Sequence, residues 1–114
     1  MKGITTHILD LVSGLPGAGI PVALERMTHT SGWTVVAETF TDADGRTQEL
    51  LPPNEAFLTG HYRLIFDTAA YFAVRNAEGF FPQITISFVV KDVGQHYHVP
   101  LLLSPFGYTT YRGS

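Results

Sequence analysis

The sequence predicts an all-β protein, a two-layer antiparallel β-sandwich of about eight strands with one short helix. Apolar runs of strand length alternate with turn-forming residues along most of the chain. One run alternates strictly and puts four apolar side chains on one face: Ile84, Ile86, Phe88 and Val90. Asp44-Gly45 is a strong signal for a tight turn, because glycine adopts positive φ at no steric cost. The 114 residues match the usual size of one domain, so we expect a single domain over residues 1–114.

The first half of the chain predicts three strands. Ile4 to Val12 is the first, and the Gly- and Pro-containing cluster from Ser13 to Gly17 stops it. Pro21 to Met27 is the second, with alternating side chains. Trp33 to Phe40 is the third, because it is rich in β-branched and aromatic residues.

The second half predicts four more strands around one irregular segment. Pro52 and Pro53 exclude a central strand, so this segment is an edge or a loop. The expected strands are His61–Phe66, Ile84–Lys91, Val99–Leu103 and Phe106–Arg112.

A single short helix is expected near residues 68–75. Asp67 is a favoured N-cap residue, and the residues after it are mostly helix formers. Arg75 suits the negative end of the helix dipole, and Asn76 is a suitable stop.

Composition excludes several classes of protein. Ten acidic and seven basic residues give a net charge of −3, so the chain lacks the basic stripe that nucleic-acid binding requires. Its longest uncharged stretch, Val93 to Tyr111, is interrupted by polar residues and prolines and predicts no membrane span. No cysteine and no leader-like start are present, so we expect a cytoplasmic protein.

Charged residues are scarce. They make up 15% of the chain, against about 25% in an ordinary domain. From Val93 to Ser114 the only charged side chain is Arg112. A surface this poor in charge predicts contact between copies of the chain.

Histidines are the first candidates for chemistry. His96 and His98 are two residues apart, so both project from one face of a strand, and His7 shares a face of the first strand with Thr5, Leu9 and Leu11. If these strands are neighbours, three imidazoles converge, which suits general acid–base catalysis. The alternative is that each is a half-buried structural residue, as we expect for His29 and His61.

Two further interpretations stay open at the level of the residues. Three histidines also match a zinc ligand set, but no acid follows Asp92 to orient their rings. Arg46, after the Asp44-Gly45 turn, is either a solvated hairpin residue or a guanidinium that binds an anionic or oxygen-rich substrate.

The last four residues, Tyr111-Arg112-Gly113-Ser114, follow directly on an apolar strand. Terminal residues usually fray, whereas this segment has the pattern of one packed against the fold. Gly113 permits a close approach, and we expect Ser114 to position substrate or water.

Four segments together resemble the transthyretin family: Thr6-His7-Ile8-Leu9-Asp10, Asp44-Gly45-Arg46, Phe81-Pro82 and the run from His96 to Pro105. The Tyr-Arg-Gly-Ser ending is similar to that of its enzymatic branch, the 5-hydroxyisourate hydrolases, and the hormone-carrying transthyretins lack it. The resemblance covers essentially the whole chain.

The resemblance implies a homotetramer, a dimer of dimers with active sites at the dimer–dimer interface. It implies hydrolysis of 5-hydroxyisourate to 2-oxo-4-hydroxy-4-carboxy-5-ureidoimidazoline in urate degradation, without a metal or other cofactor. The implied catalytic residues are His7, Arg46, His98 and Ser114. The implied substrate-binding residues are Arg46, Tyr111, Arg112, Gly113 and Ser114.

A non-catalytic carrier of a small ligand, of the transthyretin type, is the alternative function. The presence of His7, Arg46 and the C-terminal tetrapeptide favours the enzyme. Which histidine is the general base, and what His96 does, the sequence leaves open.

Overall fold

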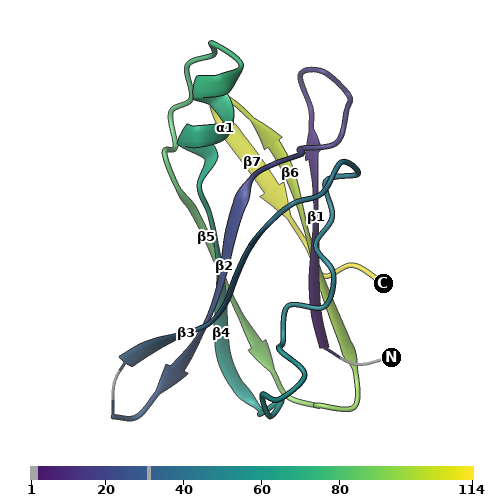
Figure 1. Ribbon diagram of the computed structural model, residues 1–114, viewed down its shortest axis with the longest axis vertical. Coiled ribbons are helices and arrows are strands. Elements are labelled where there is room, and N and C mark those ends of the chain that lie inside the picture. The colour runs from purple at the N-terminus through teal and green to yellow at the C-terminus, as the bar shows by residue number, and fades with distance from the viewer. Residues whose placement is uncertain (1–2, 31) are drawn as a thin grey trace.

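The computed structural model describes residues 3–30 and 32–114, and within them the chain forms seven strands and one helix (Figure 1). The elements are β1 (Gly3–Asp10), β2 (Pro21–Thr28), β3 (Gly32–Phe40), β4 (Gly60–Phe66), α1 (Thr68–Val74), β5 (Ile84–Val90), β6 (His96–Ser104) and β7 (Gly107–Thr110). The predicted all-β sandwich with one short helix is confirmed.

Two sheets form the layers of the sandwich. One has the order β3-β2-β4-β5 and is antiparallel throughout. The other has the order β1-β6-β7, and its β1–β6 pair is parallel. Parallel neighbours need a long crossover connection, and here the whole four-stranded sheet and α1 lie between β1 and β6 in the chain.

The segment after the Asp44-Gly45 turn takes the place of an eighth strand. Ile8 N–H donates to the Gly45 carbonyl at 2.8 Å, and Thr47 N–H donates to the Thr6 carbonyl at 3.1 Å. Leu50 N–H donates to the Ile4 carbonyl at 2.9 Å. This segment therefore covers the free edge of β1, which reduces the hazard of an open sheet edge.

The expected strands are all found, with bounds that differ by a few residues, most at the end of β1, the start of β6 and the end of β7. β1 ends at Asp10 because its Oδ1 accepts the N–H groups of Val12 (2.9 Å) and Ser13 (3.3 Å) and so forms a turn. β6 begins at His96, so both of its histidines lie in the strand. β7 ends at Thr110, which pairs with Leu101. The residue of β6 before Leu101 is Pro100, which has no N–H to donate to a neighbouring strand.

The helix has the expected caps and is tied to β1. Asp67 accepts the N–H of Ala70 at 3.1 Å, and Asn76 has a φ of 56°, which ends the helix. Tyr71 donates its hydroxyl to Asp10 Oδ2 at 2.7 Å in the interior. Burial raises the pKa of Asp10, but the bonds from Tyr71 and the backbone and the charge of Arg75 outweigh it, so this pKa lies below its ordinary value.

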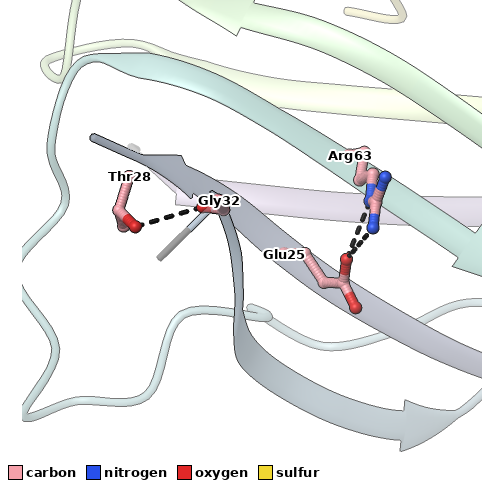
Figure 2. Close-up of polar contacts among 4 residues, drawn as sticks. All are labelled: Glu25, Thr28, Gly32 and Arg63. Carbon is pink, nitrogen blue, oxygen red and sulfur yellow. Dashed lines mark hydrogen bonds and ion pairs between the residues drawn. The ribbon is translucent and has the colours of Figure 1, made fainter. Parts of the chain in front are cut away.

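Side chains from both sheets fill the core, including fully buried Ile4, Ile8, Leu24, Leu64 and Leu101. On the four-stranded sheet, Arg63 Nε donates to Glu25 Oε1 at 2.7 Å, and Thr28 Oγ1 donates to the Gly32 carbonyl at 3.1 Å across the hairpin (Figure 2). Arg63 also stacks over the Trp33 ring, 4.2 Å from its centroid. Among the described residues, no helix is long and apolar enough to cross a membrane.

Candidate active site

The pairing of β1 with β6 builds one wall of the site. Thr5 lies opposite His98, and His7 lies opposite Pro100. Thr5 and His7 are half-buried on the outer face, while Thr6 and Ile8 point into the core. The condition stated for convergence of the imidazoles, that the first strand lies beside the strand that carries His98, is met.

A threonine hydroxyl joins the two histidines of β6. Thr5 Oγ1 lies 2.8 Å from His98 Nδ1 and 2.9 Å from His96 Nε2. The two rings stack, with centroids 6.2 Å apart and planes inclined by 25°. The strand period of two puts both rings on one face, so one hydroxyl on the neighbouring strand reaches both.

The Asp44-Gly45 turn delivers Arg46 to the edge of β1. Asp42 Oδ1 accepts the N–H groups of Asp44 (2.9 Å) and Arg46 (3.0 Å) and holds the turn. Gly45 has a φ of 74°, and a Cβ there would lie 2.5 Å from the Ile8 carbonyl oxygen, so only glycine fits. The backbone of Arg46 bridges to that of His7, and its side chain is exposed.

The C-terminal residues pack against the fold, as the sequence predicts, and the structure shows that they contact His98. Gly113 N–H donates to the His98 carbonyl at 2.8 Å. A Cβ on Gly113 would lie 2.7 Å from His98 Cδ2 and 3.1 Å from Pro100 Cγ. The absence of a side chain at Gly113 thus lets the segment approach the imidazole and places Ser114 beside it.

These elements enclose an open cavity of about 230 Å³. Its lining residues are Thr5, Thr6, Arg46, Thr47, His96, His98 and Ser114. Three of the four predicted catalytic residues therefore line one cavity. The fourth, His7, does not line it but lies close enough for its charge to act on His98.

Electrostatics favour a neutral His98. Burial lowers the pKa of His98, and electrostatic interaction with His96, Arg46 and His7 lowers it further. A neutral imidazole keeps one nitrogen lone pair, which is the state that a general base needs. The cavity thus combines a neutral imidazole, a guanidinium and a hydroxyl.

Two of the predicted substrate-binding residues, Tyr111 and Arg112, do not line this cavity. Tyr111 lines a separate cleft of about 250 Å³ beside β5. Arg112 donates to Gln95 Oε1 at 2.8 Å, and its guanidinium lies over the Tyr97 ring at 4.4 Å. The contacts of Arg112 pin the segment that carries Gly113 and Ser114.

A larger hollow, of about 450 Å³, lies at the end of the β2–β3 hairpin and includes His29 and His61. It is also lined by an arginine, Arg26, and by threonines, so residue types alone do not separate the two cavities. The smaller cavity is the candidate site because the Thr5 hydroxyl contacts both of its histidines and because the pKa of His98 is lowered there. Within residues 3–30 and 32–114, no three His, Asp or Glu side chains gather as metal ligands would.

Sequence reasoning missed Thr5 and Thr47. The sequence analysis looked for an acid that orients His96 and His98 only in the segment that carries them. The group that contacts both rings is instead the Thr5 hydroxyl, which comes from β1. The available signal was the position of Thr5, two residues before His7 on the same outward face.

Comparison with known proteins assigns the chain. The model of the HIUase/Transthyretin family matches residues 4–113. The 5-hydroxyisourate hydrolase of Salmonella dublin is 45% identical over 111 residues, which cover 97% of this chain and 80% of that protein.

Solved structures agree. The 5-hydroxyisourate hydrolase of Klebsiella pneumoniae is 35% identical with a TM-score of 0.84, over 100% of this chain and 94% of that one. Sea bream transthyretin in complex with thyroxine is 34% identical with a TM-score of 0.89, over 96% of this chain and 93% of that one. The chain belongs to the HIUase/Transthyretin family.

Proposed function

We propose that this protein is an enzyme that hydrolyses 5-hydroxyisourate to 2-oxo-4-hydroxy-4-carboxy-5-ureidoimidazoline. The supporting observation is the cavity in which His98, Arg46 and Ser114 meet. The similarity to 5-hydroxyisourate hydrolases over nearly the whole chain points to the same reaction.

In the proposed mechanism, neutral His98 takes a proton from a water molecule as the water oxygen attacks the ring carbonyl carbon. His7, beside the cavity, helps to orient that water. The negative charge that develops on the carbonyl oxygen is stabilised by Arg46, and Ser114 hydrogen-bonds substrate or water. The ring carbon–nitrogen bond then breaks, and the imidazolium returns its proton to the departing nitrogen.

Within this proposal Tyr111, Arg112 and Gly113 serve substrate binding indirectly, by holding the segment that ends at Ser114. The Gly113–His98 bond and the contacts of Arg112 fix where Ser114 stands. A misplacement of a reacting group by about 1 Å can cost about 10²-fold in rate, so this anchoring has a catalytic purpose.

We further propose that the active form is a homotetramer, a dimer of dimers that closes the cavity. The cavity is open on its outer side, and large apolar side chains are exposed beyond the end of β1 and in the β6–β7 turn. Among them are Leu11 (51% exposed), Val12 (72%), Leu15 (63%) and Phe106 (69%). Exposed large apolar side chains of this kind are often covered at an interface. Light scattering coupled to size exclusion tests the assembly, and a monomeric variant should be folded but inactive.

A carrier is the second candidate, because the fold is as similar to sea bream transthyretin as to the hydrolase. The fold therefore does not separate carrier from enzyme, and the residues in the cavity do. A carrier needs no neutral imidazole beside a guanidinium.

The deciding experiment generates 5-hydroxyisourate from urate with urate oxidase and follows its ultraviolet decay with and without the protein. The enzyme accelerates decay at catalytic concentration, whereas a carrier or an inactive protein leaves the spontaneous rate unchanged. A chelator should not alter the rate, and inactivation by it would support a zinc site.

The cytoplasmic location remains a prediction that cell fractionation tests.

A further inference from the structure

We propose that Thr5 is a positioning residue that selects the tautomer of His98. In this arrangement Thr5 Oγ1 accepts the His98 Nδ1–H and donates its own proton to His96 Nε2. His98 Nε2 then carries the lone pair that removes a proton from water. The catalytic part of this inference rests on the proposed hydrolase function, whereas the tautomer itself does not.

The number of protons on the hydroxyl restricts the possibilities. Thr5 Oγ1 contacts His98 Nδ1 at 2.8 Å and His96 Nε2 at 2.9 Å, but a hydroxyl has one proton to donate. At least one of the two rings must therefore donate to Thr5. Thr5 donates to His96, or it donates to His98, or both rings donate to it.

Only some of these arrangements make His98 a base. If Thr5 donated to His98 Nδ1, a neutral His98 would carry its proton on Nε2 and would have no free lone pair. If both rings donated, neither would accept the Thr5 proton. The arrangement in which Thr5 donates to His96 satisfies both contacts and leaves His98 Nε2 free.

The same arrangement needs no rearrangement when His98 accepts a proton. His98 Nδ1–H already points to Thr5 before and after protonation, and the Thr5–His96 bond polarises the oxygen that receives it. Neutral histidine in water prefers its proton on Nε2, so a bond at Nδ1 is needed to reverse the preference. From Val93 to Ser114 the sequence has no carboxylate side chain that could supply it.

Thr5 is well placed for this task. It lies directly opposite His98 in the β1–β6 register, and its branched side chain has restricted rotation. The charged and titratable groups that act on His98 are His96 on its own strand, His7 on β1 and Arg46 on the adjoining edge segment. Thr5 carries no charge, so it orients the ring without adding to this field.

The test compares Thr5→Val, which keeps the shape and removes the hydroxyl, with Thr5→Ser, which keeps the hydroxyl. Nitrogen-15 NMR of the ring nitrogens reports the tautomer directly in the protein without substrate. We expect the wild type and Thr5→Ser to hold His98 with its proton on Nδ1. Thr5→Val should shift His98 toward the Nε2–H form.

Kinetics give the second readout. Thr5→Val should lower kcat by about 10-fold or more while KM changes little, because ground-state contacts to the substrate are retained. The acid limb of its pH–rate profile should move to lower pH, because the protonated ring loses an acceptor. Thr5→Ser should recover most of the wild-type kcat and the wild-type pH profile.

Two results would overturn the proposal: a wild-type His98 that carries its proton on Nε2, or a Thr5→Val variant with the wild-type tautomer and kcat. A wild type that does not accelerate decay of the substrate removes the proposed function instead, and the NMR result still decides the tautomer. Circular dichroism and thermal unfolding establish that each variant is folded.

Discussion

The two sheets of this sandwich present opposite kinds of outer face. The four-stranded sheet carries the Arg63–Glu25 ion pair, with Arg63 stacked on Trp33. The three-stranded sheet carries the cluster of Thr5, His96 and His98, and the last 22 residues of the chain, Val93 to Ser114, contain one charged side chain. One face therefore contains a paired, fixed charge, and the other contains imidazole and hydroxyl groups that can exchange protons.

The difference explains why the shortage of charge is local. The cavity needs a neutral imidazole, and the fixed charge of Arg46 already favours that form by lowering the pKa of His98, so it requires no additional charged side chains. It also needs cover from solvent, which apolar contacts between subunits provide in our proposal. We therefore expect substitutions on the three-stranded sheet to affect activity and those on the four-stranded sheet to affect stability at most.

The largest expected effect is loss of activity in His98→Ala and in Arg46→Ala. Each should lower kcat/KM by at least about 10²-fold, because one removes the base and the other removes the group that stabilises the developing anion. The ultraviolet decay assay measures this effect. His61→Ala, a histidine of β4 on the other sheet, is the matched control and should keep wild-type activity. Near-normal activity of either site variant would remove that residue from the mechanism.

The lowered pKa of His98 predicts how activity depends on pH. Because the pKa of His98 is below the ordinary imidazole value of 6.5, the ring stays neutral and active below that pH. Activity that depends on neutral His98 should persist as the pH falls through 6.5 and decline only when the pH reaches the lowered pKa. An acid limb in kcat/KM centred above 6.5 would contradict this assignment.

The next effect concerns the glycine beside His98. Gly113→Ala introduces a Cβ 2.7 Å from His98 Cδ2, so the ring or the C-terminal segment must move. We expect kcat to fall by about 10-fold or more with little change in thermal stability. Gly107→Ala is the matched control, because its Cβ would meet only Ser104 Oγ, at 3.8 Å. Equal activity of the two variants would show that the close approach at Gly113 is not needed.

Residue patterns predicted the helix and most strand positions, because capping, alternation and turn chemistry are local properties. Asp67 and Asn76 act at the ends of α1 as their residue types suggest. The parallel β1–β6 pairing is not local, and the partner of His98 depends on it. Thr5 was therefore missed, although its face was predicted correctly. The contacts of Arg112 with Tyr97 and Gln95 were also beyond sequence reasoning, because they depend on how the C-terminal segment packs on the fold.

A smaller effect is expected where the three-stranded sheet is joined to α1. Asp10→Ala removes the acceptor of the buried Tyr71 hydroxyl and of two backbone N–H groups, so the free energy of unfolding should fall by about 2–3 kcal/mol. The pKa of Asp10 is lowered in the folded state, so its contribution is complete above the unfolded value of 3.8. The contribution is lost as the pH falls through the lower folded pKa.

Chemical denaturation of the wild type and Asp10→Ala at several pH values measures this dependence. The difference in unfolding free energy between the two should narrow as the pH falls below 3.8. Tyr71→Phe is the companion variant, because it removes one of the three bonds to Asp10 and keeps the ring. A difference that stays constant down to pH values at which Asp10 is protonated would contradict a charged Asp10 in the fold.

The smallest effect is expected for the ion pair of the four-stranded sheet. Arg63 Nη2 lies 2.6 Å from Glu25 Oε1, and both side chains are partly exposed, at 28% and 15%. A double-mutant cycle with Arg63→Gln and Glu25→Gln should give a coupling free energy of about 1 kcal/mol or less, reduced by salt. Neither variant should change kcat/KM, because this pair lies on the sheet opposite the cavity. A coupled loss of activity in Arg63→Gln would mean that the two sheets are not independent, and the division of labour between them would have to be abandoned.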